Sequence, residues 1–387
     1  MKQADLTLAA GPNDVSAEVK AALGGPIMYH YDPAFKERFR ETEEMVRQIY
    51  GSTSHEIIMM QGEAILGLEA AARSLVNKDT ACLNLVSGVF GKWFGFWLKD
   101  IGADLHEIEV PYDEAVTAEA VDAYLTEHPE ITVVSMVHSE TPSGTLNPVA
   151  EIGPIVRRHG AVSIVDCVSS WGGIELKPEE WQLDLLVAGP QKCLGGPPGQ
   201  SLMAISDQAW AVIDANPSAP SGSFLSITDY RDAWHGKGSF PFTPSVPEVN
   251  GVHAACRALL AEGLEASIDR HQRVFDACWA GVEAMGLTPW PASKEIASAC
   301  TTAIRVPDGL GDEQVRDHVR ATYGVQISAG QTAGNLVRIG HLGNTARPMF
   351  MVAGLAALGQ SLRDLGARVD IGGGIDAAMA SLSDSAG

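Results

Sequence analysis

The fold is decided by residues 161–199, where the apolar runs AVSIVD (161–166) and DLLVA (184–188) lead into the loop GPQKCLGGPPG (189–199). Both runs are continuous, as is typical of strands that are buried on both faces of a parallel sheet. A third run of this kind, ITVVSMV at 131–137, precedes a helical segment at 149–159. Strand–helix–strand order with short connections predicts an α/β fold, with a mostly parallel sheet flanked by helices.

The pattern changes near residue 250, where short strands give way to long helical segments. After the run at 201–205, we expect helices over 251–285, 312–322 and 347–365, and strands over 300–306, 325–328 and 335–339. The last of these helices is expected to end the fold. This predicts a large domain over 1–260 and a smaller α+β domain over 261–387, with the first ~15 residues able to join the smaller one.

The composition excludes several classes of partner. The 387 residues carry 27 basic and 48 acidic side chains, a formal net charge of −21, which disfavours nucleic acids and anionic membranes. No window is long and apolar enough for a membrane helix or a secretory signal, so a cytoplasmic protein is expected. The six cysteines form no C-x-x-C pair, and the histidines show no ligand spacing, which predicts reduced thiols and no metal site.

Lys192 and Asp166 are the candidate chemical residues. A lysine held on a rigid loop in a desolvated cleft has a lowered pKa and can form an imine with an aldehyde. An aspartate at the end of a strand can keep a pyridine nitrogen protonated, so that the ring accepts electrons. Taken alone, each residue is more often a solvated lysine or a turn aspartate. The pair favours pyridoxal chemistry.

Three further segments fit the same chemistry. Residues 60–72 predict a tight turn entering a helix, whose free N–H groups could hold an anion or a polar group. Phe90, in the aromatic stretch 84–97, could stack on a flat ring, although the other aromatic residues there fit a core patch equally well. Thr141 follows a strand and could donate to a ring hydroxyl.

Together these motifs resemble the class V aminotransferases of PLP fold type I. The resemblance covers roughly residues 7–375 and rests on the joint order of segments such as SGVFG (87–91), TPSGTLNP (141–148), GPQKCLGGPPG and PFTPSV (241–246). It implies a seven-stranded sheet, a homodimer or a dimer of dimers, and small-molecule substrates. Within the family, the same segments resemble members that take pyridoxamine and pyruvate and release pyridoxal and L-alanine.

The resemblance also implies roles for individual residues. Lys192 would form the imine and move the proton between the two carbons that exchange the amino group. The ring-binding positions are Asp166 at the pyridine nitrogen, Phe90 on the ring face in place of the usual tyrosine, Thr141 at the 3-hydroxyl, and Phe242 and Thr243 from the neighbouring subunit. The substrate-binding positions are Arg338, which would clamp a carboxylate, Tyr31, and Gln331, which stands where the family has a second arginine in a longer segment.

Glu63 lies where relatives that bind a cofactor phosphate place a small hydroxyl residue. A carboxylate at this helix start would repel a phosphate dianion and could accept a hydrogen bond from a 5′-hydroxymethyl group. Glu63 therefore favours unphosphorylated pyridoxal or pyridoxamine as a substrate in the cofactor site, although an acidic residue is also ordinary in a first helical turn.

Three alternatives remain open from the sequence. One is a PLP-dependent aminotransferase of the alanine–glyoxylate or aminophosphonate type, with tightly bound PLP. Another is a cysteine desulfurase, for which Cys300 would be the candidate nucleophile, although its apolar context favours a buried structural thiol. The last is a non-catalytic ligand-binding protein.

Overall fold

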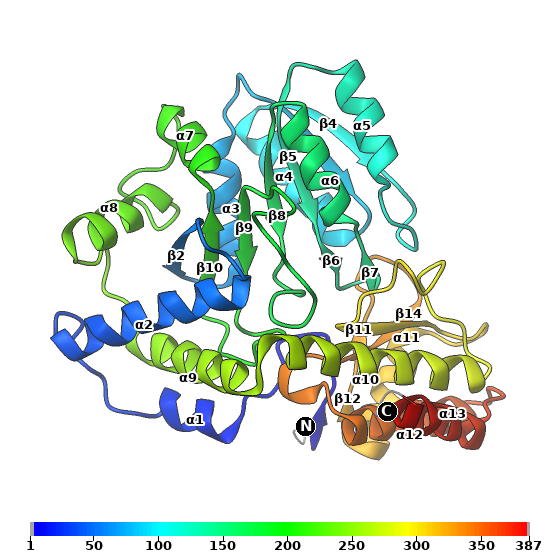
Figure 1. Ribbon diagram of the computed structural model, residues 1–387. Helices are drawn as coiled ribbons and strands as arrows, with labels where there is room; N and C mark the ends of the chain where they lie inside the picture. Colours follow the sequence, from blue (N-terminus) through cyan, green and yellow to red (C-terminus); the bar gives the residue numbers. More distant parts are fainter. Residues whose placement is uncertain (1–3, 385–387) are drawn as a thin grey trace.

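A seven-stranded sheet forms the upper part of the molecule in the computed structural model, which describes residues 4–384 (Figure 1). Its strands are β2 (Glu56–Gln61), β3 (Ala81–Val86), β4 (Asp104–Glu109), β5 (Ile131–Val137), β8 (Val162–Asp166), β9 (Leu185–Ala188) and β10 (Gln200–Ile205). The order across the sheet is β2-β10-β9-β8-β5-β3-β4. The four strands expected at 131–137, 161–166, 184–188 and 201–205 are confirmed.

The direction of the strands places six loops at one edge of the sheet, five of which carry candidate residues. Strands β3, β4, β5, β8 and β9 are parallel, whereas β10 is antiparallel to both β9 and β2. Strand β2 therefore runs in the same direction as β9. Consequently, the segments that follow β2, β3, β5, β8 and β9 all leave from the same edge, which is where open α/β sheets bind their ligands.

Helices cover both faces of this sheet and enclose two separate apolar cores. On one face lie α2 (Pro33–Tyr50), α5 (Ala118–Glu127), α6 (Val149–Arg158) and α9 (Val246–Glu262). On the other face lie α3 (Ala64–Leu75), α4 (Val89–Ile101), α7 (Asp207–Ala215) and α8 (Ile227–Lys237). The central strands are buried along their whole length, as their uninterrupted apolar sequences predict.

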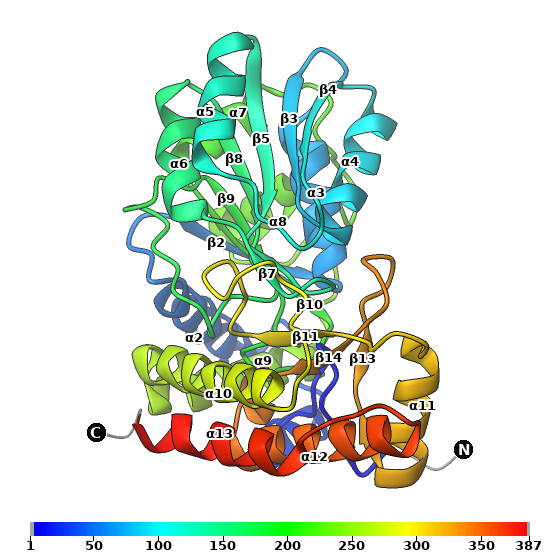
Figure 2. The ribbon, with the colours of Figure 1, turned by 90° about the vertical axis from the view of Figure 1, so that its right-hand side faces the viewer.

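The lower part of the molecule contains a three-stranded antiparallel sheet and four helices (Figure 2). The sheet has the order β11-β14-β13, with β11 (Thr301–Arg305), β13 (Ser328–Ala329) and β14 (Leu336–Gly340). The helices are α10 (Leu264–Ala284), α11 (Asp312–Tyr323), α12 (Pro348–Asp364) and α13 (Ile371–Asp384). The short strand β1 (Leu6–Thr7) pairs in parallel with β12 (Val325–Gln326), so the start of the chain lies in this lower part.

A short hairpin joins the two parts. The hairpin of β6 (Ser139–Glu140) and β7 (Thr145–Leu146) follows β5, and Thr145 bridges to Ala297 before β11. Helix α1 (Ala17–Leu23) packs on α9, and the turn η1 (Gly343–Thr345) leads from β14 to α12. The division expected between residues 260 and 261 lies inside α9 and stays a prediction.

The expectation that the helix over 347–365 ends the fold is wrong, because α13 follows it. The segment that starts α13, IGGGIDAAM, contains three consecutive glycines, which are poor helix formers. Here they serve packing: a Cβ at Gly374 would lie 2.8 Å from the carbonyl oxygen of Gly281 on α10. The glycines therefore allow two helix backbones to approach closely, a tertiary effect that outweighs their weak propensity.

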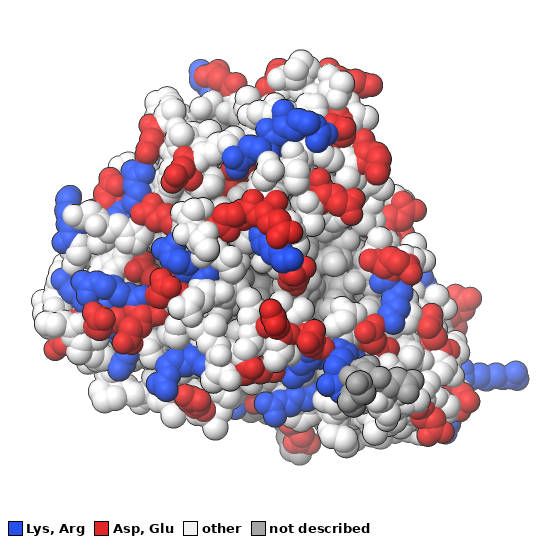
Figure 3. All heavy atoms as spheres, viewed as in Figure 1, with Lys and Arg blue, Asp and Glu red and all other residues white. Residues whose placement is uncertain are grey.

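Charged side chains of both signs are interspersed over the face shown in Figure 3. Many of the acidic residues pair with lysine, arginine or histidine on the surface, as Asp122 does with Arg158. Within residues 4–384, no helix combines the length and the apolar character that crossing a bilayer requires.

Candidate active site

Lys192 lies on the loop that follows β9, with its side chain turned into the interior. Its Nζ donates a hydrogen bond to the carbonyl oxygen of Ala10 at 2.8 Å. The neighbouring Gly11 has a φ of +98°, and a Cβ at that position would overlap the Lys192 side chain. Burial, together with the positive charge of Arg338, lowers the pKa of Lys192 to about 8, although Asp166 and Glu63 act in the opposite direction. A buried amine with this pKa is available in its neutral, nucleophilic form near neutral pH.

Asp166 is the last residue of β8 and is buried. Its Oδ1 accepts a hydrogen bond from the backbone N–H of Val168 at 2.9 Å, and none of the residues 4–384 donates to Oδ2. Burial raises the pKa of Asp166 to about 6, whereas the Val168 N–H and the charge of Lys192 lower it. A cationic N–H donor at the free oxygen would favour the ionised carboxylate.

Glu63 is the N-cap residue of α3, and both of its carboxylate oxygens are engaged. Oε2 accepts from the backbone N–H of Ile65 at 2.9 Å, and Oε1 accepts from Nε2 of Gln191 at 2.6 Å. Gln191, which directly precedes Lys192, is buried, and its Oε1 has no hydrogen-bond partner. Sequence reasoning missed Gln191, although its place next to the lysine was a usable signal.

Phe90 lies in the first turn of α4, at the same edge of the sheet. The helix has no side-chain cap of its own, and the buried carboxylate of Glu140 accepts from the backbone N–H groups of Phe90 (3.2 Å) and Gly91 (2.7 Å) instead. Burial raises the pKa of Glu140 to about 7, against the effect of these two donors. Sequence reasoning missed Glu140 as the group that anchors this turn.

The aromatic stretch around Phe90 divides between core and surface. Phe94 is buried beneath the sheet, whereas Trp93 and Phe96 are exposed. The ring of Trp93 meets the ring of Phe90 edge-on, with centroids 5.6 Å apart. The expectation that these aromatic residues form part of the core is therefore met by Phe94 but not by Trp93 or Phe96.

Arg338 and Thr141 connect the lower sheet to the hairpin that follows β5. The guanidinium of Arg338 is buried on β14, where Nε donates to the carbonyl of Ala329 at 2.6 Å and Nη1 donates to the carbonyl of Thr141 at 2.7 Å. Burial lowers the pKa of Arg338 to about 10, with Arg316 acting in the same direction. The Thr141 hydroxyl is in close contact with the hydroxyl of Ser169. Two fixed N–H groups orient the guanidinium, and Nη2, which bonds to none of the residues 4–384, is left for a carboxylate.

Four of the candidate residues make no hydrogen bond or ring contact with this group. Gln331 is exposed on the turn between β13 and β14 and has a φ of +54°. Tyr31 is exposed on the segment before α2, where its ring contacts His30. Phe242 stacks on Phe224, with ring centroids 4.2 Å apart, and Thr243 beside it is exposed. The assignment of Phe242 and Thr243 to a neighbouring subunit stays a prediction.

The grouped residues fit a pyridoxal-type ring. A buried amine, a strand-end carboxylate with a free oxygen, an aromatic side chain and a hydroxyl all leave from loops at one edge of the sheet. The unpartnered Oε1 of Gln191 is a further buried polar atom near the Glu63 end of the site. Asp166 would hold the ring nitrogen, Phe90 would cover a ring face, and Lys192 would face the reacting carbon. When bound, such a ring accepts the electron pair left by removal of a C–H proton.

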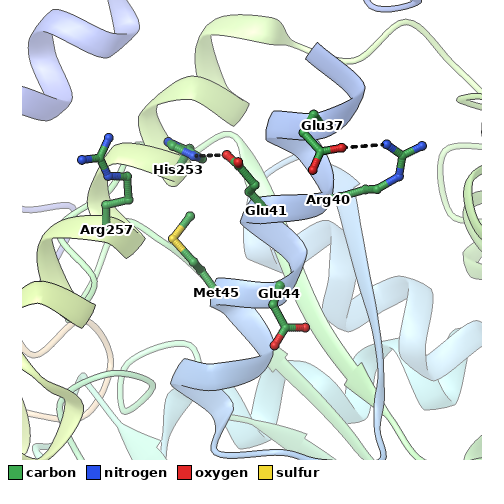
Figure 4. Close-up of a pocket in the computed structure, with 7 residues that line it drawn as sticks. All are labelled: Glu37, Arg40, Glu41, Glu44, Met45, His253 and Arg257. Atoms are coloured by element: carbon green, nitrogen blue, oxygen red, sulfur yellow. Dashed lines mark hydrogen bonds and ion pairs between the residues drawn. The ribbon is translucent and has the colours of Figure 1, made fainter. Parts of the chain in front are cut away.

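One surface pocket and one cluster of polar side chains lie away from these residues. The surface pocket in Figure 4, of about 640 Å³, lies between α2 and α9. It is lined by charged side chains that pair across it, such as His253 with Glu41 at 3.2 Å. Among residues 4–384, one group of potential metal ligands comes together, His106, His128 and Glu130 at the edge of the sheet, and it includes none of the candidate residues.

The pKa of Lys192 predicts how fast its amine reacts with an aldehyde at different pH values. Below about 8 the amine is mainly protonated, and above about 8 it is mainly neutral, so reactivity should rise with pH and level off above that value. Reductive labelling of the protein with pyridoxal, followed by peptide mass mapping, measures this for each lysine. If the labelling of Lys192 reached half its maximum at the same pH as the labelling of exposed lysines such as Lys177, the prediction would be contradicted.

The comparisons with known proteins agree with this geometry. The sequence model of the family described as Aminotransferase class-V matches residues 16–354. The chain therefore belongs to the class V aminotransferase family: it is a transaminase that works with a pyridoxal-type cofactor and small-molecule substrates. This membership confirms the expected family and excludes a non-catalytic binding protein.

Two similar proteins carry the same enzyme name. A pyridoxamine–pyruvate transaminase of Mesorhizobium japonicum is 48% identical over 97% of this chain and 96% of its own length. The crystal structure of pyridoxamine–pyruvate aminotransferase from Mesorhizobium loti superposes with a TM-score of 0.96, at 47% identity, over 99% of this chain and 98% of that one. Ureidoglycine–glyoxylate aminotransferase of Bacillus subtilis superposes with a TM-score of 0.92 at 28% identity, covering 97% of each chain. These neighbours confirm the expected PLP fold type I.

Proposed function

We propose that this chain transfers the amino group of pyridoxamine to pyruvate, giving pyridoxal and L-alanine. The observation that carries the proposal is Glu63, a carboxylate at the N-terminus of α3 held by Ile65 and Gln191. Helix N-termini ordinarily attract phosphate, and here that position already holds a negative charge. The substrate that the two similar Mesorhizobium enzymes are named for carries no phosphate, which supports the same assignment.

Each residue of the site has a task in the proposed reaction. Lys192 Nζ takes the proton from the carbon that bears the amino group of pyridoxamine and delivers it to the α-carbon of the new amino acid. Asp166 keeps the ring nitrogen protonated, and Phe90 holds the plane of the ring. Arg338 binds the carboxylate of pyruvate or alanine. Arg338 is buried and Lys192 is half-buried, so both side chains are largely shielded from water.

The proposal includes features beyond the single chain. A homodimer at least is expected, because Phe242 and Thr243 match positions that the family supplies from a neighbouring subunit. The exposed Trp93 and Phe96 beside the site are apolar surface suited to such a contact. A cytoplasmic location is also expected, since all six cysteines are buried free thiols.

The test is an assay of purified protein without added PLP. With pyridoxamine and pyruvate, we expect pyridoxal and L-alanine in equal amounts, detected by absorbance and chromatography. Absence of product, together with retention of PLP through dialysis and activity with another amino donor, would overturn the proposal in favour of a PLP-dependent aminotransferase of the alanine–glyoxylate or aminophosphonate type.

Replacing Arg338 with glutamine should raise the KM for pyruvate by about 10²-fold, because charge-assisted bonds to a carboxylate contribute roughly 3 kcal/mol. Arg338→Lys, which keeps the charge but loses the forked geometry, should recover only part of this loss. The KM for pyridoxamine should change little in both variants. Steady-state kinetics with each substrate varied separately checks the expectation, and Arg363→Gln on α12 is the control. An unchanged KM for pyruvate would contradict it.

A further inference from the structure

Two buried thiols meet where the lysine loop contacts the lower sheet. Cys193 follows Lys192 in the chain, and Cys300 immediately precedes β11 in the lower sheet. Their sulfur atoms are 3.3 Å apart, and the exposed fractions of the two residues are 1% and 0%. All six cysteines lie within the described residues, and this is the only pair of them in sulfur contact.

The surroundings make the two thiols unequal. Burial opposes ionisation of Cys193, but the hydrogen bond from Cys300 and the nearby His271 and Arg270 prevail and lower the pKa of Cys193. Burial and the contact with Cys193 raise the pKa of Cys300 well above its usual range. By contrast, burial raises the pKa of Cys167 and Cys256, neither of which contacts a second cysteine. A thiolate-like sulfur beside a second thiol is the arrangement typical of oxidation-sensitive cysteine pairs.

We propose that Cys193 and Cys300 are an oxidation site, at which hydrogen peroxide converts the two thiols to a disulfide that displaces Lys192 and reversibly inactivates the enzyme. The inactivation rests on the proposed transamination, whereas the formation of the disulfide does not. Neither sulfur has an assigned role in amino transfer.

The chemistry balances with peroxide as the only oxidant. The ionised Cys193 sulfur attacks one oxygen of hydrogen peroxide, the O–O bond breaks, and the departing hydroxide takes up the proton that Cys193 lost on ionising, which gives the first water. The Cys300 sulfur then displaces the hydroxyl group from the oxidised Cys193 sulfur, and that hydroxyl leaves with the Cys300 proton as a second water. Two thiols lose two electrons, and one peroxide is reduced to two waters.

The disulfide would act on Lys192 because the backbone on either side of Cys193 is constrained. The N–H of Gly195 donates to the carbonyl of Lys192 at 3.0 Å, and the N–H of Gly196 donates to the carbonyl of Pro190 at 2.7 Å. On the other side, the carbonyl of Cys300 accepts from the N–H of His341 at 2.8 Å, close to Arg338 on β14. A covalent S–S bond is much shorter than the 3.3 Å contact, so forming it must pull Cys193 toward β11 and Lys192 with it.

The test treats the purified enzyme with hydrogen peroxide and follows activity and peptide mass. In the wild type we expect loss of two hydrogen atoms, a cross-linked peptide pair containing Cys193 and Cys300, and an activity loss of about 10²-fold, since displacing a catalytic group by ~1 Å has an effect of that size. Dithiothreitol should restore both mass and activity. Cys300→Ser should keep its basal activity and resist reversible inactivation, whereas the control Cys256→Ser should behave as the wild type.

The outcomes separate the inference from the proposed function. If peroxide leaves both thiols free in the mass map, or if Cys300→Ser is inactivated as readily and as reversibly as the wild type, the inference is overturned. If the wild type shows no transamination with pyridoxamine, the cross-linked peptides still decide whether the disulfide forms. If Cys300→Ser fails to fold, Cys300→Ala replaces it in the inactivation assay. The peptide masses of the peroxide-treated wild type then show independently whether the disulfide forms.

Discussion

Replacing Lys192 with alanine should lower kcat for transamination by at least about 10³-fold, since a positioned proton-transfer group contributes roughly 10²–10⁴-fold and this residue also supplies the nucleophilic amine. The two carboxylates of the site offer no substitute. Asp166 lies at the carboxyl end of β8, where it would hold the ring nitrogen, and Glu63 is occupied by Ile65 and Gln191. Neither carboxylate can therefore replace the amine.

The loss should not come from unfolding. The Nζ of Lys192 makes one hydrogen bond, to Ala10, and its removal takes a costly buried cation out of the interior. We expect the melting temperature of Lys192→Ala to stay near that of the wild type and reductive labelling by pyridoxal at this position to disappear. The exposed Lys177→Ala is the matched control and should keep full activity. Activity of Lys192→Ala within about tenfold of the wild type would refute the assigned role.

The central sheet was predictable because its strands carry an unambiguous pattern. The run at 131–137 is apolar and β-branched, is bounded by polar residues, and coincides with β5. The reversed direction of β10 could not be inferred, because a run buried on both faces has the same sequence pattern in a parallel or an antiparallel pairing. Helix α13 was missed because its glycines contribute through contact with α10, which local propensity does not contain.

The candidate site was predictable where a motif follows a strand. Lys192, Asp166, Thr141 and Glu63 each follow or end a strand, so their place at one edge follows from the order of elements. The carbonyl of Ala10, which accepts from Lys192, was not predictable, because 182 residues separate the two and a backbone acceptor has no sequence signature. Glu140 was missed because an acidic side chain in a buried hairpin is explained only by the free N–H groups of α4 that it caps.

Replacing Glu63 with threonine should change which form of vitamin B6 the site retains. Two unit charges about 4 Å apart near a protein surface interact by roughly 4 kcal/mol, so losing the carboxylate should improve PLP binding by about 10³-fold. The substitution also frees the Nε2 of Gln191 as a phosphate donor near the N-terminus of α3. Binding of pyridoxamine should weaken, because the acceptor for its hydroxymethyl group is lost.

Dialysis followed by absorbance spectroscopy measures the retained PLP, and isothermal titration measures both affinities. Threonine is itself a good N-cap residue, so a change in affinity cannot be ascribed to loss of the helix start. Glu69→Gln on the same helix, where Glu69 pairs with Arg73, removes a charge of equal sign farther along α3 and should leave PLP binding unchanged. If the wild type retains PLP as firmly as Glu63→Thr does, the repulsion is not the discriminating force. Firm retention of PLP by the wild type would instead favour a PLP-dependent aminotransferase of the alanine–glyoxylate or aminophosphonate type.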